Sequence, residues 1–372
     1  MDIDFSANLL FIFGANSNIA SHRIRSIRLK TLSIPNTRVI YCSSLSDTLF
    51  LTLSKLAILF SSPWFKIFLF PKPRSPLHFL LIKILKALFH DAVVIVDVTD
   101  DILTLDRAQF CFHEFIHNVR CWSFLRSLRS ADVVVVPTMG LSSLFLSKYN
   151  LSSVIISDYL DIDCAPLSCR LNPFRNQGLQ NILWFGNSGF KSRFSSSKKF
   201  QPSGSLETLV RHLRSELISN CTITLCTNHL ESVYHYLSTS GIPSPRFNLV
   251  QWSPLALSGC LSSADTVFLS YSSSMNGNSG LKSLNRIELA LYSGLPCVIV
   301  NPPMDHDPSN LFIRSTSPHS YISSDHPDFQ SSILIHPSSH ALDLLLEAQA
   351  SIDGDWIELI TTAYLIQKNS RP

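Results

Sequence analysis

Short apolar runs alternate with segments of helical length along most of the chain, and this alternation restricts the possible folds more than any other feature. In the first half the runs end at Gly, Pro, Asn, Asp or Ser, as strands do, and most are rich in β-branched residues. They span residues 9–13, 38–42, 66–70, 92–98, 132–136 and 153–156, with expected helices at 17–30, 46–60, 76–90, 107–129 and 141–149. Near-continuous apolar strands alternating with helices predict a parallel sheet covered on both faces.

The alternation is interrupted once and then restarts. Residues 166–180 contain two prolines and a glycine among polar residues and are predicted to form a linker. Expected strands follow at 181–185, 221–225, 247–250, 266–269, 296–300 and 332–335, and expected helices at 205–217, 230–239, 254–261 and 281–293. One or two further helices are expected at 340–368, with a break near Asp353 and Gly354.

The fold class predicted from this pattern is α/β, with two Rossmann-like domains whose parallel sheets face each other across a cleft. The first domain is expected at 1–165 and the second at 181–338, while helices at 339–372 pack back toward the first domain. In open parallel sheets, ligands bind beyond the carboxyl ends of the strands. The loops that directly follow the strands are therefore where functional side chains are expected.

Composition narrows the class of protein. Charged residues make up 15% of the 372 residues and the net charge is +3, which does not favour a nucleic-acid partner. The nine cysteines include no C-x-x-C pair, which indicates reduced thiols in a cytoplasmic protein and no zinc knuckle. No apolar run reaches the roughly 18 residues that a membrane-spanning helix requires, and the first residues do not resemble a secretion signal.

The strongest candidate binding segment is NGNSGLKSLNRIELALYSGLP, residues 276–296, where a loop of Asn, Gly and Ser leads into a helix expected to begin near Leu281. The N-terminus of a helix presents unpaired N–H groups and partial positive charge, which suit a diphosphate. Lys282 and Arg286 are four residues apart and share one face of this helix. The candidate ligand-binding residues here are Ser279, Gly280, Lys282, Ser283, Asn285, Arg286 and Glu288.

The stretch from Glu288 to Pro296 resembles the E-A-x-A-x-G-x-P signature of GT-B glycosyltransferases, and the segment before it resembles a variant found in poorly characterised members. The resemblance extends over about residues 181–300. It implies a nucleotide-sugar donor held in the second domain, with the diphosphate on Lys282 and Arg286 and the ribose on Glu288. It also implies transfer of the sugar to a glycan or lipid-linked acceptor of unknown identity, without a resident cofactor or metal.

The segment departs from the signature in two places. Glu288 lies six residues before Gly294 rather than five, and the position eight residues before Glu288, where many members carry a second glutamate, is Gly280. A catalytically inactive nucleotide-binding protein with the same fold is therefore the alternative hypothesis.

Two other loops carry candidate site residues. After the strand at 181–185, Gly186, Asn187 and Lys191 could approach a phosphate. In the first domain, His22 and Asp100 follow the ends of strands and are candidate general bases.

Two features suggest other chemistry. His113-Glu114-x-x-His117 has the spacing of a zinc metallopeptidase motif, but it lies in a crossover helix without a recognisable third ligand, so this is a distant alternative. The helix expected at 77–89 is apolar nearly all round and carries Lys83 and Lys86. A peripheral contact with the inner face of a membrane is one interpretation of this helix, and a buried crossover helix is the other.

Overall fold

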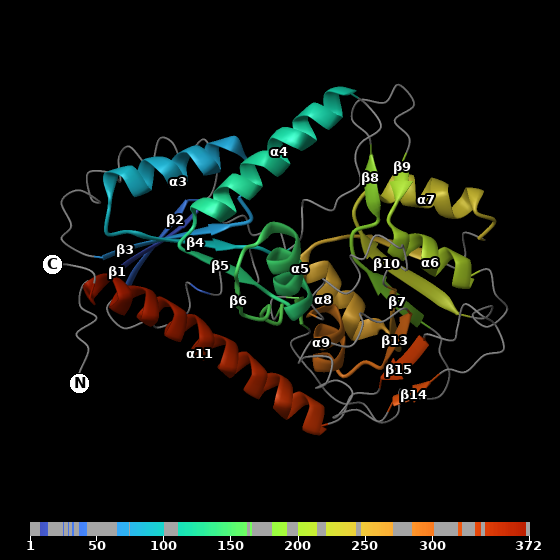
Figure 1. Cartoon of the computed structure of the whole chain (residues 1–372). Coiled ribbons are helices and arrows are strands. Elements are labelled where there is room, and N and C mark those ends of the chain that lie inside the picture. The colour runs from blue at the N-terminus through green and yellow to red at the C-terminus, as the bar shows by residue number, and fades with distance from the viewer. Residues whose placement is uncertain are drawn as a thin grey trace. The chain divides into compact units, whose positions relative to one another are not determined.

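The structure of the protein is a computed structural model (Figure 1). It describes residues 8–13, 25, 29, 32, 37–42, 65–73, 75–99, 111–161, 164–165, 181–191, 200–213, 221–242, 247–270, 285–300, 319–321, 332–335 and 339–369. The chain forms two compact units. The first consists mainly of Met1–Tyr159 and Ala348–Pro372, and the second mainly of Leu160–Gly280 and Leu284–Glu347.

The first unit is built on a parallel sheet of six strands in the order β2-β1-β3-β4-β5-β6. This is a doubly wound order of the flavodoxin type, extended by one strand. The strands are β1 (Asn8–Phe13), β2 (Thr37–Cys42), β3 (Phe65–Pro71), β4 (Val93–Asp97), β5 (Val133–Val136) and β6 (Val154–Ile155). The helices described between them are α3 (Pro76–Leu88), α4 (Cys111–Ser130) and α5 (Met139–Tyr149).

Each face of this sheet has its own apolar core, because successive strand residues point to opposite sides. Phe11, Phe13, Phe68 and Phe70 face α3 and α4. Leu10, Ile12, Ile67 and Leu69 face α11 (Ser339–Asn369), whose Trp356 and Ile360 are buried against them.

The second unit contains a sheet of seven strands in the order β11-β10-β7-β12-β13-β15-β14. Its parallel strands are β7 (Asn181–Phe185), β10 (Thr222–Thr227), β11 (Phe247–Gln251), β12 (Thr266–Ser270) and β13 (Cys297–Val300). In chain order these five follow the Rossmann sequence 3-2-1-4-5. The helices are α6 (Gly204–Leu213), α7 (Leu230–Thr239), α8 (Pro254–Ser263) and α9 (Asn285–Tyr292).

The expectation of two Rossmann-like α/β domains is confirmed, and three details of the prediction are wrong. The edge strand β15 (Ser332–Ile335) runs antiparallel to β13, with β14 (His319–Tyr321) beyond it. Residues 189–191, predicted as loop, form the strand β8 (Gly189–Lys191), which pairs in a hairpin with β9 (Phe200–Pro202). The C-terminal helix α11 continues through Gly354, because burial of neighbouring Ile352 and Trp356 outweighs the roughly 1 kcal/mol cost of a helical glycine.

Within the part of the chain that the structure describes, no helix combines the length and apolar character needed to cross a membrane.

Candidate functional site

The second sheet has its topological switch point between β7 and β12. From β7 the chain proceeds outward to β10 and β11, and then returns to β12 on the other side of β7. The crossover connections diverge at such a point, so the carboxyl ends of the two central strands are left accessible to a ligand. The loop that begins at Gly186 lies at this end of β7.

Gly186 and Arg286 are brought together at the end of β7. Arg286 lies in the first turn of α9, and its Nη1 atom donates a hydrogen bond of 3.4 Å to the carbonyl oxygen of Phe185. The same atom would lie 3.0 Å from a β-carbon at position 186, where the backbone φ is +151°. Glycine is therefore needed here both for the backbone conformation and for the approach of the guanidinium group.

The loop after β7 is fastened to the end of β10. The Thr227 hydroxyl donates to the Gly186 carbonyl at 2.7 Å. The Ser188 hydroxyl donates to the Asn228 carbonyl at 2.8 Å, and the Asn228 side-chain oxygen accepts from the Ser188 N–H at 3.2 Å. Thr227, Ser188 and Asn228 were not predicted from the sequence, because Ser, Thr and Asn follow strands at many places in this serine-rich chain. Their hydrogen bonds hold Gly186 in place beneath Arg286.

The neighbouring strand β12 is tied to the start of α6. The Ser270 hydroxyl donates to the Ser205 carbonyl at 2.7 Å, and the indole N–H of Trp184 donates to the Ser205 hydroxyl at 3.2 Å. The two serine hydroxyls are 3.0 Å apart. These contacts fix the first turn of α6 against the two central strands. No sequence pattern distinguishes these serines from the others.

The remaining predicted residues of the second domain lie in three settings. Asn285 and Glu288 are half-buried in the first turn of α9, whereas Leu289 is buried in the core, so the carboxylate lies on the accessible side of the helix. Asn187 accepts a hydrogen bond of 3.1 Å from the Gly189 N–H, and Lys191 lies in β8 with its side chain outside the described residues. Ser279, Gly280, Lys282 and Ser283 also lie outside them.

The arrangement at the end of β7 is suited to an oxyanion. A guanidinium group and the N-terminal turn of a helix present N–H groups in one region of the second unit, where Gly186 has no side chain to obstruct them. The Gly186 N–H itself donates to the Cys226 carbonyl at 3.3 Å. The guanidinium and helix N–H groups are donors of the kind that form charge-assisted hydrogen bonds with phosphate oxygens.

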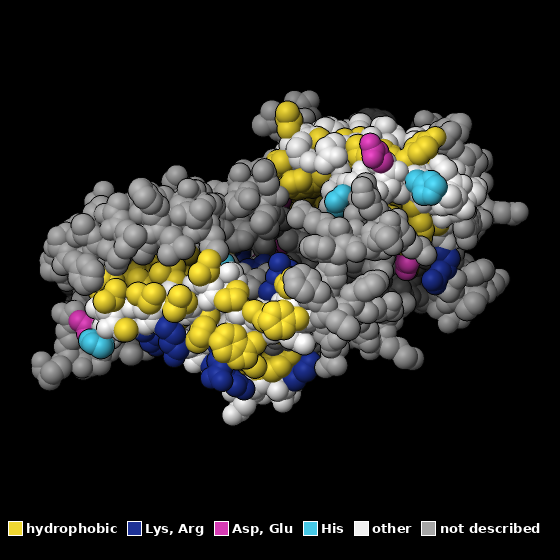
Figure 2. Space-filling model, turned by 90° about the horizontal axis from the view of Figure 1, so that it is seen from above, with side chains coloured by type: hydrophobic (Ala, Val, Ile, Leu, Met, Phe, Trp, Pro, Cys, Tyr) yellow, Lys and Arg dark blue, Asp and Glu magenta, His cyan; other side chains and the backbone are white. Residues whose placement is uncertain are grey.

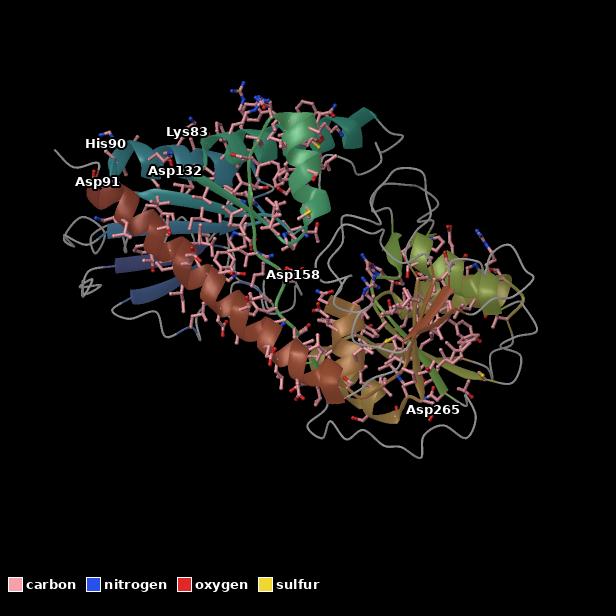
Figure 3. All side chains as sticks on the ribbon, turned by 60° about the horizontal axis from the view of Figure 1, so that its bottom comes forward. Lys83, His90, Asp91, Asp132, Asp158 and Asp265 are labelled. Carbon is pink, nitrogen blue, oxygen red and sulfur yellow. The ribbon has the colours of Figure 1, made fainter. Side chains whose placement is uncertain are left out.

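The described part of the first unit contains a buried ionic cluster. His22 and Asp100 lie outside the described residues. Arg25 is fully buried, and its guanidinium binds Asp97 at 2.7 Å, Asp158 at 2.6 Å and the backbone carbonyl of Ile156. Burial raises the pKa of Asp97 to about 6, although Arg25 acts in the opposite direction. Asp158 lies in the segment after β6 (Figure 3). The cluster joins segments within the core of the first unit.

The metallopeptidase motif lies in α4, as expected for a crossover helix, but the side chains of His113, Glu114 and His117 are outside the described residues. Among the side chains that are described, no group of three or more His, Cys, Asp or Glu could hold a metal ion.

No protein-family model matches the sequence, and no curated protein matches it significantly. Solved structures with similar backbones include a putative UDP-N-acetylglucosamine 2-epimerase from Listeria monocytogenes, with 10% identity, 94% of this chain and 90% of that chain covered, and a TM-score of 0.46. The MnaA–UDP structure from S. aureus is 12% identical to this chain, and the alignment covers 83% of this chain and 82% of that chain with a TM-score of 0.43. The glycosyltransferase SnogD from Streptomyces nogalater is 12% identical, and the alignment covers 96% of this chain and 99% of that chain with a TM-score of 0.37.

The fold class rests on the chain's own sheets, which make two Rossmann-like units, and the second of these units places Arg286 over Gly186 at its topological switch point.

Proposed function

We propose that this protein is a glycosyltransferase that moves a sugar from a nucleotide-sugar donor to a glycan or lipid-linked acceptor. The observation that carries the proposal is the contact of Arg286 with Gly186 at the end of β7. It places a fixed positive charge where a Rossmann-ordered sheet binds nucleotides. The resemblance of residues 288–296 to the GT-B signature supports the same assignment.

The proposed chemistry is cleavage of the bond between the anomeric carbon and the diphosphate, with the acceptor oxygen forming the new bond. The electron pair of the broken bond stays on the diphosphate, whose negative charge grows in the transition state. Arg286, Lys282 and the N-terminus of α9 stabilise that charge, so neither a resident metal nor a cofactor is proposed. Glu288 accepts hydrogen bonds from the ribose hydroxyls. The other donor-site residues are Gly186, whose missing side chain leaves room for the phosphates, and Asn187, Lys191, Ser279, Gly280, Ser283 and Asn285, which contact phosphate oxygens.

A base is needed to take the proton of the acceptor hydroxyl, and His22 and Asp100 remain the proposed candidates. Asp97 is a poor candidate, because one of its carboxylate oxygens is bound by the buried Arg25. We propose a cytoplasmic location, with peripheral contact at the inner face of the membrane.

The direct test is stabilisation by nucleotides. A ligand at a hundred times its dissociation constant adds about 2.7 kcal/mol to the free energy of unfolding. Melting temperatures of the full chain should rise with at least one member of a panel of nucleoside diphosphates and nucleotide-sugars. Arg286→Ala should abolish the rise, whereas the matched control Arg211→Ala, an exposed arginine on α6 of the same unit, should retain it. If no member of the panel shifts the melting temperature of the wild-type protein, the donor site is wrong.

A non-catalytic nucleotide-binding protein is the second candidate, because Gly280 stands where many GT-B members carry a second glutamate. It predicts the same stabilisation without turnover. Release of nucleoside diphosphate that depends on the acceptor, from any donor in the panel, would exclude it.

A further inference from the structure

The outer face of α3 is apolar although it is exposed. Leu77, Leu80, Ile84 and Leu88 recur at helical spacing and are between 41% and 52% exposed, while Ile82 and Leu85 on the inner side are fully buried. A helix that only covered a sheet would need apolar side chains on its inner side, such as Ile82 and Leu85, and polar side chains on its outer side. Packing of the core in the first unit therefore does not explain why the four exposed positions of α3 are apolar.

The adjacent helix α4 extends this apolar surface. Phe115 is 65% exposed and Trp122 is 51% exposed. The Trp122 ring meets the Phe79 ring of α3 edge to face, with a centroid distance of 5.4 Å. Figure 2 shows the exposed hydrophobic side chains of this face gathered together, with Lys and Arg side chains along their border. The docking surface comprises Leu77, Phe79, Leu80, Ile84, Leu88 and Trp122.

The charge around this docking surface is strongly one-sided. The sequences of α3 and α4 contain five Lys or Arg residues and a single Glu, while the whole chain has a net charge of only +3. Lys83 lies 5.9 Å from the centre of the Phe79 ring, and Arg126 lies 5.8 Å from that of Trp122. Lys83 is on the outer side of α3, whereas Lys86 is bound to Asp132 (Figure 3). The partner of this face therefore combines an apolar interior with negative charge.

We propose that the docking surface of α3 and α4 binds the headgroup region of an anionic lipid bilayer. Leucine and isoleucine side chains enter the boundary between headgroups and acyl chains, Trp122 lies at the interface, and Lys83 and Arg126 contact lipid phosphates. A second copy of the chain fits less well, because a symmetric contact would bring the two basic borders together. The inference rests on the peripheral membrane contact proposed above and assigns a surface to it. It does not depend on the donor site, since the surface lies in the first unit and requires no nucleotide.

The first test is co-sedimentation of the full chain with vesicles. Phosphatidylcholine vesicles containing about one third phosphatidylserine should bind the protein, pure phosphatidylcholine should bind it far less, and added salt should weaken binding. Lys83→Glu with Arg126→Glu should lower partitioning at least about tenfold, on the usual contribution of basic residues near such surfaces. Leu80→Gln with Ile84→Gln should also lower it. The matched controls Arg211→Glu and Leu255→Gln, exposed residues of the second unit, should bind as wild type.

The second test identifies the inserted residue by fluorescence. The quenching test uses the protein with Trp64→Phe and Trp252→Phe, in which Trp122 is the one tryptophan left besides the fully buried Trp184 and Trp356. Lipids with brominated acyl chains should quench this protein, and adding Trp122→Phe should remove most of the quenching. Equal binding to neutral and anionic vesicles, or quenching that survives Trp122→Phe, would overturn the proposal. Self-association or capture of a protein partner that is lost in Leu80→Gln with Ile84→Gln, without vesicle binding by the wild type, would assign the surface to that partner instead.

Discussion

The Nη1 atom of Arg286 lies 3.0 Å from the position that a β-carbon would take at Gly186. Because the loop beneath is held by Thr227 and Ser188, the arginine rather than the backbone has to move when a methyl group is added. Gly186→Ala should therefore weaken binding of nucleoside diphosphates at least about tenfold, or 1.4 kcal/mol, in calorimetric titrations. The control is Gly241→Ala, which also has a positive φ, of +78°, but meets no atom within 4 Å. Equal loss of affinity in both variants would show that backbone strain, not Arg286, causes the effect.

Arg286 and Glu288 should affect catalysis differently. If Arg286 faces charge that grows on the leaving diphosphate, Arg286→Ala lowers both kcat and kcat/KM. Ribose hydroxyls do not change during the reaction, so Glu288→Gln should mainly raise KM. The rise should correspond to a loss of about 1.5–3 kcal/mol of binding free energy for each charged hydrogen bond removed. Steady-state kinetics with the donor found in the nucleotide panel separates these effects. Wild-type values in both variants would contradict the donor site.

The ionic cluster of Arg25 should matter for stability rather than for binding. Arg25→Met leaves two buried carboxylates, Asp97 and Asp158, without their partner. Removing one member of a buried ion pair costs about 3–5 kcal/mol. Urea unfolding should show that Arg25→Met lowers the free energy of unfolding by this amount. Adding Asp97→Asn to Arg25→Met should restore part of that free energy. A loss below about 1 kcal/mol would mean that water reaches the cluster.

His78 should make the stability of α3 depend on pH. Burial lowers the pKa of His78 from 6.5 to about 4, and its Nδ1 atom accepts the Ser75 N–H at the start of the helix. The fold favours the neutral ring, so this contribution is complete above about pH 6.5 and is lost as the pH falls toward 4. The difference in melting temperature between wild type and His78→Gln should shift in favour of the variant over that interval. A constant difference would show that His78 has the same pKa in the folded and unfolded chains.

The sequence predicted the central strands well because buried parallel strands are almost continuously apolar and β-branched, as Val93–Asp97 and Val133–Val136 illustrate. The sequence did not predict the buried ionic cluster of Arg25, since only the fold brings the carboxylates of Asp97 and Asp158 beside it. The direction of β15 depends on the path of its connection rather than on its composition.

The candidate site was also predicted only in part. Gly186 and Arg286 were predicted as donor-site residues because the first follows an expected strand and the second lies in an expected helix after a loop of Asn, Gly and Ser. The structure brings the two residues together. The residues that hold the loop, Thr227, Ser188 and Asn228, act through hydrogen bonds whose partners are distant in sequence. No local pattern marks such residues.

The helix α11 has a consequence for the order in which the protein can fold. Trp356 and Ile360 fill part of the core against β1 and β3, although β3 ends at Pro71 and the chain between them includes the whole second unit. The first unit therefore cannot complete this core until α11 has left the ribosomal exit tunnel. Until then Leu10, Ile12 and Ile67 lack the part of their core that Trp356 and Ile360 supply, and apolar surface exposed in this way promotes association between chains.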